Sequence, residues 1–302
     1  MTEPLATGPS ALERLLKRDR AITLAGLLAL CALAWAYVLS GAGLGMSAWE
    51  MTTVSLFPHT RHDPAPAMSG MSMPGMDMSG MPGMAMDSAA SASKQWGVST
   101  WALVTAMWWT MMIAMMSPSA APTILLYARV HRHAAAQDQI QAASGPTGAF
   151  TAGYLAIWLG FSAIAATLQW LLQQQGLVSA TMMGSQSRYL SGGVLIAAGV
   201  YQFSPLKNLC LSHCRAPTEF LSRHWRPGAA GAFRLGALHG AYCVGCCWIL
   251  MALLFVGGVM NLVWIAALAL LVLAEKVAPA GRWIGRGLGL LFIAWGAATF
   301  FV

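Results

Sequence analysis

Long apolar runs alternate with short charged segments along the whole chain. The apolar runs cover residues 21–39, 98–127, 149–172, 189–206, 235–255, 259–274 and 287–302. Most of them approach the roughly 20 residues that a helix needs to cross the hydrocarbon core of a bilayer. The pattern predicts an all-α, polytopic integral membrane bundle of about seven transmembrane helices. Pro118 and Pro122 are expected to kink or break the second helix near its end.

Composition supports this class of protein and excludes others. Hydrophobic residues make up 57% of the chain and charged residues only 9%, which rules out an ordinary soluble domain. The net charge of +7 indicates no nucleic-acid partner, because the basic residues sit in the segments between apolar runs. The six cysteines lie mostly in or beside apolar runs, unlike a secreted disulfide framework. The first run lacks a small-residue cleavage site and is interpreted as a retained helix.

The basic residues also predict an orientation. With the N-terminus in the cytoplasm and seven spans, 14 of the 17 lysines and arginines lie inside. Only Arg61, Lys94 and Arg188 lie outside. We therefore expect a multi-pass protein of a bacterial inner membrane with its C-terminus outside. Its parts are a cytoplasmic tail and first helix (1–45), an extracytoplasmic loop (46–97) and a six-helix core (98–302).

The outer loop is rich in methionine. Gly, Ser, Pro and Asp separate eight of them, namely Met68, Met71, Met73, Met76, Met78, Met81, Met84 and Met86, and His59 and His62 precede them. Thioethers are soft donors for Cu(I) that cannot form disulfides in an oxidising compartment. The pattern favours copper capture, with Cu(II) held by the histidines. The alternative is a disordered linker of biased composition.

A methionine row continues into the second apolar run. Met107, Met111 and Met115 recur at helical spacing, with Met112 and Met116 beside them. Such a face would pass a soft cation inward. Methionine is also common packing material in membrane helices, so packing is the alternative interpretation.

Two sets of cysteine and histidine lie towards the inner side. One comprises Cys210, His213 and Cys214, and the other His239, Cys243, Cys246 and Cys247. The second set falls on one stripe of a helix and suits Cu(I) or Zn(II) far better than Mg or Ca. Both sets approach the membrane from the same side, so we expect that they can meet. Cysteines acting only as small hydrophobic packing residues remain the alternative.

Two polar positions flank the sixth apolar run. Asn261 is expected to cap its start as a helix. Glu275 at its end is either an interfacial residue, or one that pairs with Lys207 or tunes a site.

Three segments, 107–122, 201–217 and 236–276, give the chain a family resemblance. Over residues 98–276 it resembles a family of uncharacterised bacterial proteins described as predicted metal-binding integral membrane proteins, some labelled copper chaperones. The resemblance implies a membrane-embedded metal role for Cys210, Cys214, His239, Cys243, Cys246 and Cys247. The methionine-rich loop is not part of the shared pattern, and it favours copper over other metals.

The leading hypothesis is therefore a Cu(I)-handling membrane protein, with zinc the less favoured metal. The outer loop would capture copper, and the Met, Cys and His sites would hold it or relay it, either across the membrane or to a cuproenzyme or soluble copper chaperone. The sequence leaves delivery, transport and storage open. No nucleotide-binding loop or phosphorylated-Asp motif is apparent. The alternatives are a subunit of a thiol–disulfide or copper-dependent membrane oxidoreductase, for which Cys243 and Cys246 form a C-x-x-C pair, and a structural subunit of a membrane complex. An enzyme is the less favoured class, and the sequence leaves the oligomeric state open.

Overall fold

The structure is a computed structural model that describes residues 11–43, 47–52, 96–136, 145–180 and 182–301. Side chains are described from residue 21 onwards. These residues form helices joined by turns, with one isolated antiparallel bridge between Val178 and Ser185. The prediction of an all-α fold is confirmed.

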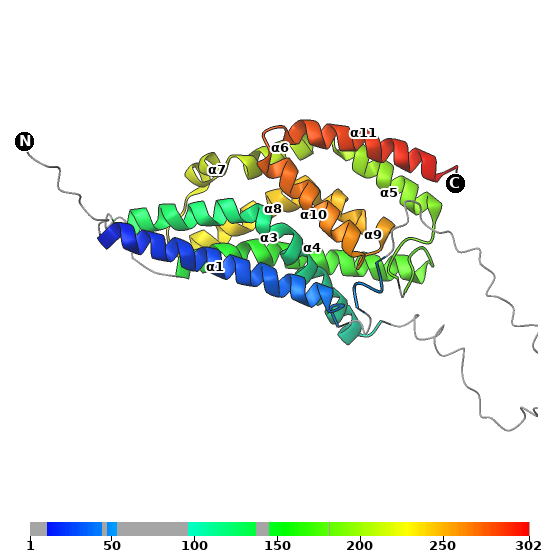
Figure 1. Ribbon diagram of the computed structural model, residues 1–302, viewed down its shortest axis with the longest axis horizontal. Coiled ribbons are helices and arrows are strands. Elements are labelled where there is room, and N and C mark those ends of the chain that lie inside the picture. Colours follow the sequence, from blue (N-terminus) through cyan, green and yellow to red (C-terminus); the bar gives the residue numbers. More distant parts are fainter. Residues whose placement is uncertain (1–10, 44–46, 53–95, 137–144, 181, 302) are drawn as a thin grey trace, which may run out of the picture.

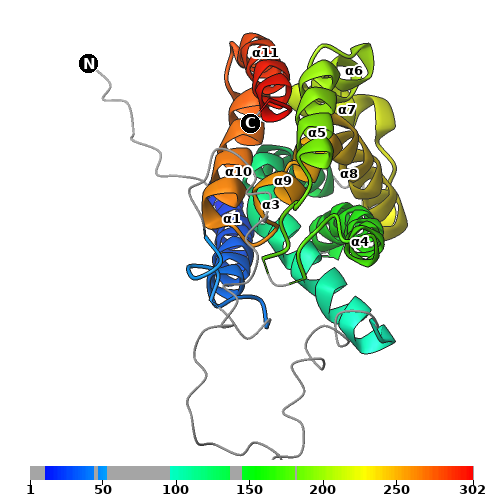
Figure 2. The same cartoon turned by 90° about the vertical axis from the view of Figure 1, so that its right-hand side faces the viewer.

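The helices lie side by side as an elongated bundle (Figure 1). Their order is α1 (Ala11–Leu39), α3 (Val98–Ala136), α4 (Gly145–Gln174), α5 (Arg188–Tyr201), α6 (Pro205–Arg215), α7 (Pro217–His224), α8 (Gly228–Ala252), α9 (Leu254–Gly257), α10 (Leu262–Val277) and α11 (Gly281–Thr299). The start of α1 lies at one end of the bundle and the end of α11 at the other. Seen end-on, α3 lies between α1, α4 and α10, and it contacts all three (Figure 2).

Several of these helices are long and apolar enough to cross a membrane. Among the described residues, four stretches qualify by length and composition, namely Ala21–Leu39, Val98–Ala134, Gly145–Gln174 and Gly228–Gly257. Helices α5 and α6 together would form a fifth span, bent by 63°. The α10 helix has only 16 residues, fewer than a full span needs. The protein is thus a helical membrane protein, and the seven-span topology remains a prediction.

Of the kink or break predicted at the two prolines of the second helix, the break does not occur. Helix α3 continues through Pro118 and Pro122 to Ala136, beyond the predicted limit of 127. Proline at 118 removes the amide that would have bonded the carbonyl of Ala114. The thiol of Cys31 on α1 points at that carbonyl, with 3.8 Å between sulfur and oxygen. A neighbouring helix thus supplies a weak donor where the helix itself has none.

The expected boundary after the fourth run is also wrong. The apolar helix α5 ends at Tyr201, before the predicted limit of 206, and the polar segment that follows forms α6 and α7. Ser204 starts α6 because its hydroxyl accepts a hydrogen bond from the amide of Leu206, with Pro205 in the first turn. Asn261 caps α10 as predicted, accepting from the amides of Val263 and Trp264.

Glycine allows helices α4 and α8 to approach each other closely. At Gly236 on α8, a Cβ atom would collide with the carbonyl of Phe150 on α4. One turn along α4, a Cβ at Gly153 would collide with the carbonyl of Phe233. Small residues at such crossings let two backbones approach within van der Waals distance. This packing fixes α8, with its three cysteines, against α4.

Candidate metal centre

Helix α8 directs three cysteines into the protein. Cys243, Cys246 and Cys247 are all buried, with at most 2% of each residue exposed. The thiols of Cys246 and Cys247 both donate to the carbonyl of Cys243, at sulfur–oxygen distances of 3.1 and 3.0 Å. The spacing of three and four residues places them on one face, as the sequence predicted. We call these three residues together with Cys214 and Met116 the sulfur cluster.

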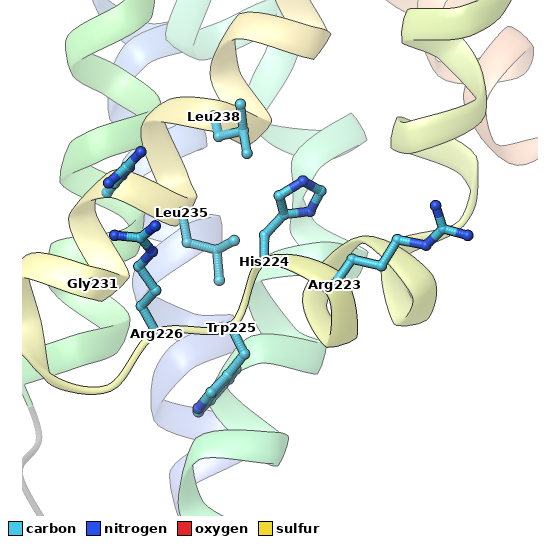
Figure 3. Close-up of a pocket in the computed structure, with 8 residues that line it drawn as sticks. Arg223, His224, Trp225, Arg226, Gly231, Leu235 and Leu238 are labelled. Carbon is cyan, nitrogen blue, oxygen red and sulfur yellow. The ribbon is translucent and has the colours of Figure 1, made fainter.

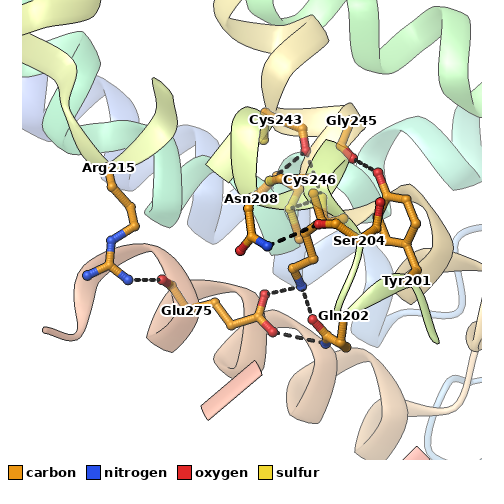
Figure 4. Close-up of polar contacts among 12 residues, drawn as sticks. Tyr201, Gln202, Ser204, Asn208, Arg215, Cys243, Gly245, Cys246 and Glu275 are labelled. Atoms are coloured by element: carbon orange, nitrogen blue, oxygen red, sulfur yellow. Dashed lines mark hydrogen bonds and ion pairs between the residues drawn. The ribbon is translucent and has the colours of Figure 1, made fainter. Parts of the chain in front are cut away.

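Helix α6 brings the other cysteine set against this face. The side chain of Cys214 on α6 lies beside that of Cys246 on α8. The sulfur of Cys210 packs on the backbone of Gly245, where a Cβ atom would lie 2.8 Å from it. The hydroxyl of Tyr201, at the end of α5, donates to the carbonyl of the same glycine (Figure 4). The two cysteine sets, far apart in sequence, therefore meet in the structure.

The central helix α3 contributes a thioether. The Sγ atom of Cys247 lies 4.0 Å from the Sδ atom of Met116. The predicted row of Met107, Met111 and Met115 is buried too, each residue at most 1% exposed. All of these methionines therefore face protein and not lipid. Met116, one turn beyond Met112, is the methionine that contacts a cysteine.

Helix α10 adds a lysine to the cluster. The Nζ atom of Lys276 lies 2.9 Å from Sγ of Cys243 and 3.0 Å from Oγ of Ser119 on α3. The hydroxyl of Tyr154 on α4 is 3.2 Å from the same sulfur. Residues from α3, α4 and α10 thus surround a cysteine of α8.

Glu275, the residue before Lys276, belongs to a second group of buried polar side chains. Glu275 pairs with Lys207 of α6, with 2.6 Å between Oε2 and Nζ, and accepts a hydrogen bond from Gln202 (Figure 4). Lys207 also donates to the side-chain carbonyl of Gln202. The guanidinium of Arg215 donates to the backbone carbonyls of Glu275 and Ala278. Of the predictions for Glu275, the pairing with Lys207 is confirmed.

The two histidines of the predicted cysteine and histidine sets occupy different surroundings. His239 is buried on α8 one turn before Cys243, and its Nδ1 atom has no hydrogen-bond partner in the structure. Its ring lies among Tyr154, Phe150 and Phe220, with centroid distances of 5.8, 6.2 and 5.4 Å. His213 instead stacks on Tyr242 at 4.1 Å and bonds the carbonyl of Leu209.

The residues predicted in the outer loop cannot be placed. His59, His62 and the eight methionines from Met68 to Met86 lie outside the described residues. Their role in copper capture stays a prediction.

The donor set fits a soft monovalent metal better than a hard one. Thiols and a thioether prefer Cu(I), and a buried histidine nitrogen without a partner is a further donor. Among the described residues, however, no three His, Cys, Asp or Glu side chains are arranged to hold a metal ion. Two thiols are engaged by the Cys243 carbonyl, so they would have to turn about χ1 to coordinate a metal. Cu(I) accepts few ligands, so a rearrangement of two or three sulfurs is enough.

A separate pocket lies beside the start of α8 (Figure 3). It has a volume of about 310 Å³ and is lined by His224, Trp225, Leu235, Leu238 and the arginines at 223, 226 and 234. Arg223 extends away from the other side chains and pairs with Glu219 at 2.7 Å. A cavity lined by guanidinium groups repels cations. We therefore do not assign copper binding to it.

Sequence reasoning placed Met116 only beside the predicted methionine row, and it assigned no metal-site role to Lys276, Ser119 or Tyr154. The sequence could have pointed to Lys276, because an ionisable residue within a membrane segment usually serves a function. The predicted methionine row on α3 is Met107, Met111 and Met115, and Met116 lies beside it. Ser119 and Tyr154 carried no signal, since hydroxyls on apolar helices are common.

The comparisons with known proteins agree with this chemistry. Residues 105–299 match the model of the family PpoB2, described as copper chaperone. The matched region includes α4 to α11 and most of α3, and so every helix that contributes to the sulfur cluster. In comparisons with curated proteins and with solved structures, nothing matches the chain.

Proposed function

Because the chain belongs to the PpoB2 copper chaperone family, we propose that it holds Cu(I) at the sulfur cluster and delivers it to a recipient protein. The observation that carries this proposal is the meeting of Cys214, Cys246, Cys247 and Met116 from three helices. Copper is the cargo here. The buried thiols and thioether are soft ligands that bind Cu(I) in preference to the hard cations of the cell.

The proposal includes a direction across the membrane. The protein would be a seven-helix protein of a bacterial inner membrane, with the methionine-rich loop outside and the N-terminus in the cytoplasm. That loop would capture copper, and Met107, Met111 and Met115 would line the way to the cysteines. The burial of these three methionines inside the bundle supports a protein-lined route, since a lipid-facing row could not shield a cation. A cuproenzyme or a soluble copper chaperone would receive the metal.

Copper stoichiometry and Cu X-ray absorption on the purified protein test the proposal. The variants are Cys243, Cys246 and Cys247 replaced together by Ser, and a deletion of residues 68–86. Cys31→Ser is the matched control, because Cys31 on α1 contacts the carbonyl of Ala114 and not the cluster. We expect sulfur coordination in the wild type and in the control, and its loss in the triple variant. Unchanged copper in the triple variant would refute the site.

The deletion separates capture from holding. At limiting copper, loss of the loop should slow copper loading, while the final sulfur-coordinated amount at excess copper stays the same. Equal loading rates with and without the loop would remove the capture role and leave the cluster unaffected.

One contact favours a second candidate, a thiol–disulfide oxidoreductase. The lysine Nζ atom only 2.9 Å from Cys243 Sγ would stabilise a thiolate, as in reactive cysteines. Redox partners need access to the sulfur, however, and Cys243 is 0% exposed. Protein without copper above the triple Ser variant, but with thiols that titrate as a reversible redox couple, would favour the oxidoreductase.

A further inference from the structure

Lys276 is a buried cation with no carboxylate partner among the described residues. It is 8% exposed, and its ammonium group contacts the sulfur of Cys243 and the hydroxyl of Ser119. A lysine is almost never buried unless a negative group compensates its charge. The lysine therefore requires a negative group in its surroundings.

The carboxylates among the described side chains are all engaged elsewhere. They are Glu50, Glu219 and Glu275. Glu50 accepts a hydrogen bond from the amide of Ser47. Glu219 pairs with Arg223, and Glu275 pairs with Lys207. The charged groups of α6, Lys207 and Arg215, are directed at Glu275 and at backbone carbonyls. Within the part of the chain that the structure describes, the groups left to compensate Lys276 are the cysteines of the cluster.

We propose that Lys276 makes the sulfur cluster selective for monovalent soft cations, Cu(I) and Ag(I), over divalent Zn(II). This proposal rests on the proposed function. Two thiolates around a monovalent ion leave one surplus negative charge, and the ammonium of Lys276 cancels it. Two thiolates around Zn(II) are already neutral, so the same ammonium leaves one surplus positive charge. Each thiol releases its proton to water when it coordinates, and the metal keeps its oxidation state.

The low dielectric of the site decides how strongly this balance acts. The site lies inside a helical bundle, where interactions between charges are several-fold stronger than in water. A surplus charge therefore raises the free energy of the occupied site, and the site favours the ion whose charge leaves no surplus. Ser119 completes the arrangement by accepting a hydrogen bond from the same ammonium, which directs it at Cys243. Lys276 is thus a positioning and charge-balancing residue and not itself a ligand.

Competition titrations with Cu(I), Ag(I) and Zn(II) on the full-length purified protein test this inference. The variants are Lys276→Gln, which removes the charge, and Lys276→Arg, which keeps it. We expect Lys276→Gln to bind Cu(I) and Ag(I) about tenfold or more weakly, with equal or tighter Zn(II) binding. Lys276→Arg should keep the preference of the wild type. A double variant, Lys207→Gln with Glu275→Gln, removes a buried pair at constant net charge and should keep the preference as well.

The outcomes separate the two proposals. If Lys276→Gln weakens the binding of Cu(I) and of Zn(II) equally, or weakens the binding of neither, the charge-balance inference is overturned while the copper site stands. If the wild type binds neither Cu(I) nor Ag(I) through its cysteines, the proposed function and the inference both fail. Should Lys276→Gln not fold, Lys276→Met replaces it, because an apolar side chain of similar length is tolerated better in a buried site.

Discussion

The Nζ atom of Lys276 lies 2.9 Å from the Sγ atom of Cys243, and this contact joins α10 to α8 inside the bundle. The preceding residue, Glu275, pairs with Lys207 and so joins α10 to α6. Two adjacent residues at the end of a short helix thus connect to both helices that supply cysteines to the sulfur cluster. The geometry of the sulfur cluster therefore depends on the position of this helix end.

The ion pair between Glu275 and Lys207 should contribute strongly to stability. Both side chains are only 3% exposed, so Glu275→Gln leaves a buried ammonium without its counter-charge. We expect a loss of about 3–5 kcal/mol in the free energy of unfolding. Denaturant unfolding in mild detergent, followed by circular dichroism, measures it.

The matched control is Glu219→Gln, which breaks an exposed pair with Arg223 and should change stability by about 0–1 kcal/mol. Replacing both partners, Lys207→Met with Glu275→Leu, should recover most of the loss because no unpaired charge remains. A Glu275→Gln protein as stable as the wild type would show that the pair is not important for folding.

The close packing of α4 on α8 predicts an effect of a single methyl group. Gly236→Ala places a Cβ atom against the carbonyl of Phe150 and forces the helices apart. Such overpacking is expected to lower stability by about 1–3 kcal/mol. Gly160→Ala on α4 is the control, because nothing lies within 4 Å of its Cβ position. Equal thermal stability of the two variants would contradict the packing described here.

Much of this architecture could be predicted from the sequence, because apolar length and helical periodicity are local properties. Cys243, Cys246 and Cys247 share a face for that reason, and Asn261 caps α10 through its nearest amides. The helix through Pro118 could not be predicted, since the donor facing the Ala114 carbonyl is Cys31 on another helix.

The candidate site was predictable only in its cysteines. Cys214 reaches Cys246 because α6 turns by 63° from α5, and a bend of that size depends on packing against α8. The role of Lys276 depends equally on tertiary structure. Its position next to Glu275 suggested a helix end at the membrane surface, whereas the two residues point to two different buried partners.

His239 offers a test that separates binding from folding. Its Nδ1 atom is buried without a partner, which is unfavourable in a metal-free protein. His239→Phe puts a third apolar ring beside Phe150 and Phe220, so stability should stay within about 1 kcal/mol of the wild type. If the imidazole is a copper ligand, Cu(I) affinity should fall in the same variant. His224→Phe, at the basic pocket, is the control that should leave Cu(I) affinity unchanged. A large loss of stability in His239→Phe would indicate a structural histidine.

Met116 is the thioether that the structure puts next to a cysteine, and its removal should affect copper and little else. Met116→Leu keeps the volume and apolar character of the side chain, so the free energy of unfolding should change by less than about 1.5 kcal/mol. The variant loses the sulfur that lies 4.0 Å from Cys247. We expect Cu(I) affinity to fall on the order of tenfold, as for other changes around metal sites. Met260→Leu is the matched control, since Met260 is also 0% exposed but lies at the turn between α9 and α10. Competition with a Cu(I) chelator measures both variants. Equal affinities in Met116→Leu and Met260→Leu would mean that the cysteines hold copper without a thioether, and X-ray absorption would then show the same sulfur coordination in both variants.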